Sequence, residues 1–420
     1  MKNNLLTDQN NYRKTVLSNG VRIISEEIPY VRSVSIGAWI MVGSRDEDEN
    51  INGITHLIEH MVFKGTEKRN VRMIAQSLES VGGYLNAFTS KEHTCYYARV
   101  LDEHAEKAID ILSDLILHPL FDAKDLEKEK AVILEELKNY EDEPDEVIHD
   151  EFDKALFQPH PLAYNILGTR ETLKTLKKPM IDLYKNKHYT SDNIIVCAAG
   201  NISHDKLIDL SSKYFSELKT SKNKHKRVLL KPKQKAVTVN IIKPIQQAHI
   251  CYGTRTFKVS DERRFPFIVL NTILGDGMGS RLYQSIRERQ GLAYSVYSFA
   301  NFLTDTGSFG IYAGTDKSKT TLSLSLIKKE LENFVRKPVS KAELTRTKAQ
   351  VKGNMLLGLE SMSNRMMRLA KGEIYYGKFN TVDSLVEKIN KVDPSSIQKV
   401  AEDIFDLTKF NLITLVPENN

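Results

Sequence analysis

Cysteine is scarce in this chain of 420 residues, which holds only Cys95, Cys197 and Cys251. An odd and widely spaced set argues against a disulfide framework and indicates a reducing compartment. Long apolar runs are also missing, since no stretch approaches the roughly 20 apolar residues of a membrane span. Residues 1–16 show neither the apolar core of a secretory signal nor the Arg- and Ser-rich pattern of a transit peptide. We therefore expect a cytoplasmic protein with no membrane partner.

Neither sign of charge dominates, because 60 Lys and Arg face 54 Asp and Glu. The basic run 221–235 has no interleaved aromatic residue and no nucleic-acid-binding motif around it. A solvated linker between domains is the favoured interpretation, and no nucleic-acid partner is expected. The acidic block 135–153 contains Lys138 as its single Lys or Arg and is typical of a solvated face, although it lies beside a candidate site.

The chain is too long for one ordinary core and favours two domains of roughly 200 residues. Strands are predicted as a hairpin around Asn19-Gly20, then at 31–43, 84–100 and 193–202. Helices are predicted before Gly65 and at 72–80, 102–117, 122–140 and 145–156.

The second half repeats this order of elements. Its strands are predicted at 236–255, 293–315 and 409–418, and its helices at 264–290 and 341–361. Aligning Leu126 with Leu344 sets Glu129 against Thr347 and Glu136 against Asn354. The prediction is an α+β fold made of a duplicated domain, with an N-terminal copy at 1–218, a linker at 219–236 and a C-terminal copy at 237–420. Candidate chemistry lies in the first copy alone.

The stretch 53–66, GITHLIEHMVFKGT, places two histidines four residues apart, with Glu59 directly before the second. On a helix His56 and His60 lie on one face, about 6 Å apart along the axis, and Glu59 lies at its edge. These side chains could hold one metal ion and its water, or they could be ordinary surface residues. A catalytic zinc site needs a third protein ligand, and Glu59 is the candidate general base on the zinc-bound water.

The helix predicted at 122–140 offers that third ligand. Four of its residues recur at i, i+3, i+4 and i+7 and are expected to share one buried face: Glu129, Val132, Ile133 and Glu136. Buried carboxylates are costly unless they are paired or bound to a cation. We predict Glu136 as the ligand and Glu129 as the partner that orients a histidine. Glu135 lies about 100° round the helix and is expected to face solvent.

These residues carry a resemblance to a known family. H-x-x-E-H is the inverse of the zincin order. With HLIEHMVFKGT, VGGYLNAFTSKEHTCYY, Glu129 and Glu136, the chain resembles the pitrilysin/insulinase (M16) metallopeptidases along nearly its whole length. The short bacterial form, similar to the mitochondrial processing peptidase β subunit, matches best. The resemblance implies two homologous α/β-sandwich domains of the LuxS/MPP-like fold, forming half of a clamshell, with one Zn2+ per chain. The family's glutamate ligand follows the second histidine at the spacing of Glu136 from His60.

The resemblance also implies substrate-binding residues. Arg287 and Tyr294 match the arginine and tyrosine that bind substrate carbonyls at the scissile bond, although a surface arginine and a core tyrosine are the ordinary alternative. Asn86 and Ala87 match an edge strand that receives an extended peptide through its backbone. Phe63 matches a residue of the pocket just after the cut.

Two acidic residues predict substrate choice. Glu146 and Asp150 stand at i and i+4 on the helix after Pro144, where processing-peptidase relatives hold acids that receive a substrate arginine. We therefore expect arginine two residues before the cut and a large apolar residue after it. The alternative is that the acidic block is only a solvated face.

The predicted function is a zinc-dependent endopeptidase that cleaves extended, basic or presequence-like peptides inside a closed chamber. Both the zinc motif and the Arg/Tyr pair are present, so we expect a homodimer that needs no inactive partner. The alternative is a non-catalytic assembly subunit of the same fold, like the respiratory-chain core proteins, which have lost the metal set that this chain keeps.

Overall fold

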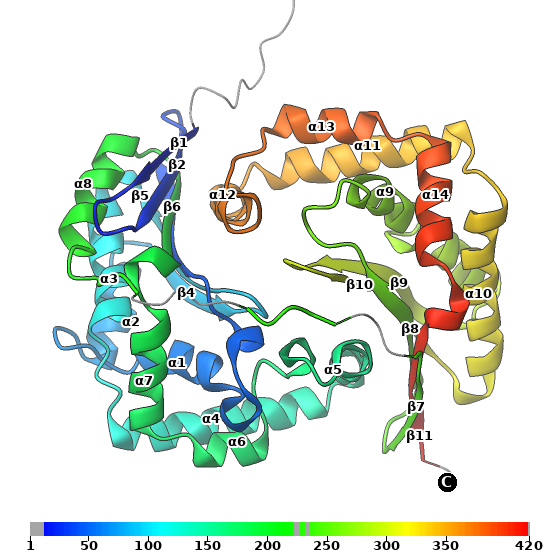
Figure 1. The fold of residues 1–420 in the computed structure, drawn as a ribbon, viewed down its shortest axis with the longest axis horizontal. Helices are drawn as coiled ribbons and strands as arrows, with labels where there is room; N and C mark the ends of the chain where they lie inside the picture. The colour runs from blue at the N-terminus through cyan, green and yellow to red at the C-terminus, as the bar shows by residue number, and fades with distance from the viewer. Residues whose placement is uncertain (1–11, 222–226, 232–234, 419–420) are drawn as a thin grey trace, which may run out of the picture. The chain divides into compact units, whose positions relative to one another are not determined.

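The computed structural model describes residues 12–221, 227–231 and 235–418. The chain divides into two compact units, each with one sheet and helices packed against it (Figure 1). Unit 1 takes the described residues of Met1–Leu137, Tyr164–Val228 and Gly358–Thr381. Unit 2 takes those of Lys138–Ala163, Leu229–Leu357 and Val382–Asn420. The mixed, two-domain α and β fold predicted from the sequence is confirmed.

Unit 1 contains a six-stranded sheet in the order β1-β2-β6-β3-β5-β4. Its strands are β1 (Tyr12–Val16), β2 (Arg22–Glu27), β3 (Ser33–Ile40), β4 (Tyr84–Thr89), β5 (Thr94–Leu101) and β6 (Ile194–Gly200). The predicted hairpin is present, since β1 pairs antiparallel with β2. One sheet face shares a core with α1 (Ile54–Val62), α2 (Val71–Glu79), α3 (Ala105–Leu117), α4 (Ala123–Glu141), α7 (Lys178–His188) and α8 (His204–Tyr214). The short α6 (Arg170–Thr175) precedes α7.

Unit 2 repeats this topology without a counterpart of β1. Its sheet order is β7-β11-β8-β10-β9, built from β7 (Thr238–Lys243), β8 (Ala248–Thr256), β9 (Ala293–Phe302), β10 (Gly307–Thr315) and β11 (Asn411–Pro417). The β7–β11 pair is parallel, as β2–β6 is in unit 1, and the remaining pairs are antiparallel in both sheets. One face packs on α9 (Arg264–Gly275), α10 (Thr320–Arg336), α11 (Lys341–Gly358), α13 (Val382–Asn390) and α14 (Pro394–Ile404).

The other face of each sheet is covered by a helix from the opposite half of the sequence. Helix α12 (Met362–Tyr376) belongs to unit 1, and α5 (Pro144–Phe157) belongs to unit 2. A Cβ added at Gly37 of β3 would lie 2.6 Å from the sulfur of Met366, and one at Gly253 of β8 would lie 2.7 Å from the ring of Phe152. The units therefore differ from the contiguous division at 218 and 237, because apolar periodicity shows that a helix is buried but not which sheet buries it.

The predicted linker at 219–236 lies partly outside the described residues, at 222–226 and 232–234. Within it, the expectation of a solvated basic run is wrong for Arg227, whose side chain is 16% exposed. Its Nε lies 2.9 Å from Asp46 Oδ1 and its Nη1 lies 3.8 Å from Glu92 Oε1. Both carboxylates are fully buried, so they need a cation that the sequence pattern alone did not assign to them.

Two scarcities of the sequence have structural counterparts. All three cysteines are buried free thiols. Over the described parts of the chain, no helix combines the length and the apolar character needed to cross a membrane.

Candidate metal centre

Helix α1 presents two histidines from within the core of unit 1. Leu57, Ile58 and Met61 are completely buried and hold the helix against the sheet. His56 is buried and His60 is half-buried, with their ring centroids 4.6 Å apart. The i, i+4 spacing therefore brings both imidazoles to one place.

Helix α4 adds a carboxylate to this pair. One ligand atom from each of His56, His60 and Glu136 lies within 4.8 Å of the others, and His60 Nε2 is 3.7 Å from Glu136 Oε2. Ligands of one tetrahedral zinc lie roughly 3.5 Å apart, so a small adjustment of side chains would complete the set. Among the described residues this is the one group of three or more His, Cys, Asp and Glu side chains that gathers in this way. Glu135 is not part of it, although the role of Glu136 as a ligand stays a prediction.

The chemistry of these donors fits a divalent metal. Nδ1 of His56 is buried and has no hydrogen-bond partner among the described residues. Burial, with a smaller contribution from His60, lowers the pKa of His56 to about 3. The imidazole is therefore neutral at physiological pH, which is the form that binds metals. Two imidazoles and a carboxylate are donors that zinc accepts.

Glu129 lies next to His60, and its predicted role of orienting that ring stays a prediction. Its Oε2 is 3.3 Å from His60 Nδ1, and its Oε1 is 2.7 Å from Lys64 Nζ. The sequence prediction missed Lys64, which lies four residues after His60 in the turn that follows α1. Lys64 gives the buried Glu129 carboxylate a cationic partner and limits its rotation.

The expected buried face of α4 is wrong in two positions. Val132 is 48% exposed and the Glu136 side chain 45%, whereas Ile133 is completely buried. The buried residues of α4 are Leu126, Glu129, Lys130, Ile133 and Leu137. These residues also recur at helical spacing, but their stripe is rotated about the helix axis relative to the predicted one. Glu136 therefore lies at the margin of the buried face, next to His60, rather than inside the core.

Glu59 lies beside the histidines with a fixed orientation. The Thr89 hydroxyl at the end of β4 donates a hydrogen bond to Glu59 Oε2 at 2.6 Å. Burial raises the pKa of Glu59, and the Thr89 hydrogen bond and His60 oppose this in part. A carboxylate with a raised pKa is a stronger base at neutral pH. Thr89 was not predicted, because its contact joins residues 30 apart in the sequence.

Strand β4 stands at the edge of the unit 1 sheet, where its pairing partner is β5. The backbone N–H of Ala87 donates to Asn86 Oδ1 at 2.8 Å. Phe63 ends α1 and packs half-buried against the core. The edge position that peptide addition requires is therefore present, and binding by these three residues stays a prediction.

Arg287 and Tyr294 lie together in unit 2. Arg287 Nη1 donates to the Tyr294 carbonyl at 2.7 Å, and its guanidinium lies 4.8 Å from the Tyr294 ring centroid. Tyr294 is 77% exposed, which excludes a core tyrosine. Arg287 sits in a π-helical turn, Tyr283–Glu288, a local form that is frequent at functional sites. Their role at a scissile bond stays a prediction.

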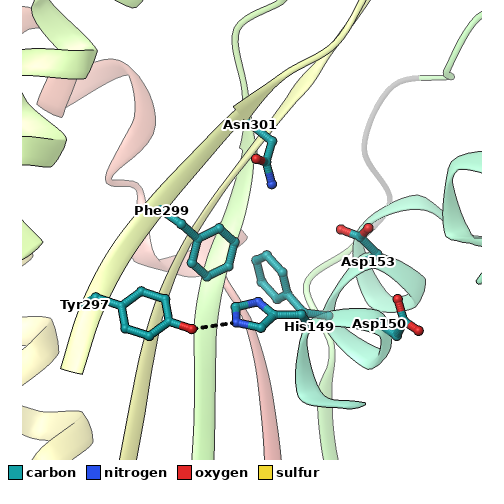
Figure 2. A pocket seen from close by; sticks show the side chains of 7 residues that line it. His149, Asp150, Asp153, Tyr297, Phe299 and Asn301 are labelled. Carbon is teal, nitrogen blue, oxygen red and sulfur yellow. Dashed lines mark hydrogen bonds between the residues drawn. The ribbon is translucent and has the colours of Figure 1, made fainter. Parts of the chain in front are cut away.

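A pocket of about 330 Å³ in unit 2 is lined by Asp150, one of the two acids predicted to receive arginine (Figure 2). Asp150 and Asp153 of α5 line it with Phe299 and Asn301 of β9. His149 Nε2 lies 2.9 Å from the Tyr297 hydroxyl at the same pocket. Glu146 is exposed and is not a lining residue. The second carboxylate at this pocket is that of Asp153, and the role of Glu146 and Asp150 in binding arginine stays a prediction.

Comparison with known proteins assigns the family. Residues 22–170 match the insulinase (peptidase family M16) model, and residues 177–351 match the peptidase M16 inactive domain. An uncharacterized zinc protease of Bacillus subtilis is 42% identical over 97% of this chain and 99% of its own length. One from Streptomyces coelicolor is 39% identical over 93% of this chain and 87% of its own length.

Solved structures share the fold. A protease from Helicobacter pylori has a TM-score of 0.91 at 21% identity, over 97% of this chain and 99% of that one. A peptidase M16 inactive domain from Pseudomonas fluorescens has a TM-score of 0.91 at 19% identity, with the same coverage. The level of identity to the bacterial zinc proteases, over almost the whole chain, shows that this protein belongs to peptidase family M16.

Proposed function

We propose that this chain is a zinc-dependent endopeptidase. The gathering of His56, His60 and Glu136 beside Glu59 carries the proposal, in a chain whose 42% and 39% identical relatives are named zinc proteases. Zinc supplies a Lewis acid that polarises a peptide carbonyl and lowers the pKa of water.

The chain's own side chains supply the remaining chemistry. His56, His60 and Glu136 would hold the ion, and Glu129 would receive the Nδ1–H of His60 and fix the ring. The Glu59 carboxylate accepts a proton from the water whose oxygen bonds to the peptide carbonyl carbon. It then delivers this proton to the amine nitrogen as the C–N bond breaks. The hydrogen bond from Thr89 leaves Oε1 of Glu59 for this transfer.

The substrate is an extended peptide. It adds to the edge strand β4 through the backbone of Asn86 and Ala87. Phe63 contacts a large apolar side chain after the cut, and Arg287 with Tyr294 binds a carbonyl near the bond. This combination favours unfolded segments, because strand addition requires a free peptide backbone.

A preference for arginine two residues before the cut is part of the proposal. Asp150 lines a pocket with a second carboxylate and aromatic rings, a setting that suits a guanidinium. The variant Glu146→Lys, Asp150→Lys should keep its zinc and cut arginine-free peptides while losing the preference. Asp142→Lys, an exposed change in the same acidic block, is the matched control. Unchanged preference in the double variant would show that neither acid is the receptor.

The assembly is proposed to be a cytoplasmic homodimer with a closed chamber and one zinc per chain, active without a second polypeptide. Light scattering on the purified chain, with peptide hydrolysis measured on the same sample, tests this. Activity that appears only after a different protein is added would contradict it.

The direct test of function combines metal analysis with cleavage-site mapping on a peptide library. We expect one zinc per chain, hydrolysis that a chelator removes and zinc restores, and cuts inside the peptides. The alternative, a non-catalytic assembly subunit, finds some support in the inactive-domain match to residues 177–351, but that region excludes His56, His60 and Glu136. A zinc-loaded chain that cuts no peptide would favour it.

A further inference from the structure

Helix α1 begins without a cap of its own. Its N-cap is Gly53, which has a φ of 93° and no side chain to accept hydrogen bonds from the first turn. A Cβ at this position would lie 2.8 Å from Gly168 Cα and 2.8 Å from the Leu167 carbonyl oxygen. The serine, threonine or aspartate that usually caps a helix therefore has no room here. The first-turn N–H groups need an acceptor from elsewhere.

Glu47 provides that acceptor from six residues upstream. Its Oε2 accepts hydrogen bonds from the Gly53 N–H and from Asn52 Nδ2, both at 2.8 Å. Its Oε1 accepts the Thr55 N–H at 2.9 Å. The carboxylate is 3% exposed and stands at the positive end of the helix dipole, where negative charge is stabilising.

The same turn is tied to the segment 165–184. Asn52 Nδ2 also donates to the Asn165 carbonyl at 2.9 Å, and its own carbonyl accepts from Thr172 Oγ1 at 2.7 Å. Thr55 Oγ1 lies 2.8 Å from the Tyr184 hydroxyl. The residue after Thr55 is His56. Its backbone is therefore fixed by hydrogen bonds on the turn that precedes it.

We propose that Glu47 is a positioning residue for the metal centre, which caps α1 and thereby holds His56 in the place where it binds the ion. This inference rests on the proposed function. A buried carboxylate is a costly cap, and burial raises the pKa of Glu47 to about 7. The groups that oppose this rise are the donors of the turn, Asn52, Thr55 and Gly53. The Glu47 carboxylate is thus stabilised by hydrogen-bond donors at the start of α1.

The test is Glu47→Gln in the full chain. The amide keeps the shape of the side chain but presents an NH2 group to at least one N–H donor of the turn. Zinc affinity is measured by competition with a chelator, and the Co2+-substituted protein gives an absorption spectrum that reports ligand geometry. We expect zinc binding to weaken about tenfold or more and the cobalt spectrum to change.

Glu373→Gln is the matched control. Glu373 is also a buried carboxylate of unit 1, but it lies on α12, against the opposite face of the sheet, and pairs with Lys14 and Arg22. Its loss should lower the melting temperature and leave zinc affinity unchanged. Equal weakening by both variants, or wild-type affinity and spectrum in Glu47→Gln, would overturn the inference.

Two further results can occur: the Glu47→Gln variant does not fold, or the wild-type chain binds no zinc. If Glu47→Gln yields no folded protein, Asn52→Ala replaces it, because it removes one donor to Glu47 and leaves the backbone cap. A loss of about threefold in zinc affinity is then expected, the value of one hydrogen bond, and no loss would overturn the inference. If the wild-type chain binds no zinc, the proposed function fails and this inference with it, whereas a zinc-binding wild type with an insensitive variant removes the inference alone.

Discussion

Helices α4 and α11 hold equivalent places in the repeated topology but differ in charge. Leu126 and Leu344 are 3% and 6% exposed, and the next equivalent pair, Glu129 and Thr347, are 5% and 4% exposed. Burial is thus shared at these two positions, while the chemistry of the second buried side chain differs. A carboxylate is tolerated at this position in unit 1 because Lys64 and His60 contact it.

The helices that follow β3 and β8 show the same contrast. Helix α1 places His56 and His60 among buried aliphatic side chains, while α9 has the sequence RFPFIVLNTILG, without histidine or acid. One framework therefore supports a polar centre in unit 1 and an apolar core in unit 2. The comparison shows that the fold places equivalent side chains at equivalent buried sites. Whether such a site can hold a charged side chain depends on neighbouring partners such as Lys64.

The largest effect is expected from removing Glu59, the proposed general base of unit 1, which has no counterpart in α9 of unit 2. Glu59→Gln should lower the rate of peptide hydrolysis about 10²–10⁴-fold, because general base catalysis is lost. The three proposed ligands remain, so metal analysis should still find one zinc per chain. Loss of the zinc in this variant would assign Glu59 a ligand role instead.

The next effect separates two neighbouring acids of α4. Glu136→Gln should lose zinc on dialysis, since a protein ligand is gone, while Glu135→Gln should keep it. The amide variants have nearly the same shape, so each serves as control for the other. Equal loss from both would contradict the geometry that groups only Glu136 with the histidines.

Glu129 and Thr347 can each be replaced by the residue that the other unit carries, and both changes should have a cost. Glu129→Thr should weaken zinc binding about 10–100-fold, because His60 loses its partner. Thr347→Glu should lower the free energy of unfolding by about 3 kcal/mol, because a carboxylate is buried without the Lys64 and His60 contacts of unit 1. Thr347→Val, measured by the same denaturant titration, should cost less. A stable Thr347→Glu protein would show that unit 2 already offers a cation there.

The last effect concerns pH and is small per pH unit. Burial raises the pKa of Glu47 from 4.5 to about 7, so the folded chain binds more protons than the unfolded one between these values. Stability from this group is therefore present below pH 4.5 and is lost as the pH rises through 7, by about 1 kcal/mol per unit at the steepest part. The nearby phenols of Tyr164 and Tyr184 stay neutral in this window, since burial raises their pKa values.

The free energy of unfolding of the wild type minus that of Glu47→Gln, plotted against pH, separates the contribution of Glu47 from that of the other titrating groups. Denaturant titrations of both proteins between pH 4.5 and 8 provide it. The wild type should lose stability relative to the variant as the pH rises. Parallel curves would show that Glu47 titrates alike in the folded and unfolded chain.

Features that depend on neighbouring residues could be predicted from the sequence. The Asn19-Gly20 turn gave the β1–β2 hairpin, and the 3.6-residue period of α4 distinguished Glu136, which gathers with the two histidines, from its neighbour Glu135. The order of strands in the repeat was also accessible, because each element has its own pattern.

Contacts between distant residues were not accessible in the same way. Arg227 looked like part of a solvated run, because its partners Asp46 and Glu92 lie far from it in the sequence. Glu47 gave no signal, since a cap is usually sought at the N-cap position itself. Periodicity reports that a side chain is buried or exposed, and it does not identify the group that buries it or balances its charge.

The exchange of α5 and α12 has a consequence for synthesis on the ribosome. Unit 1 needs the segment Gly358–Thr381, which emerges only after the 129 residues Leu229–Leu357 have been made. At usual elongation rates this takes roughly 6–25 s. Until then a nascent chain presents the apolar sheet face of Ile24, Trp39 and Ile195 without its covering helix. Translation of this protein thus leaves one apolar face of the first sheet exposed for a set interval before its own covering helix is made.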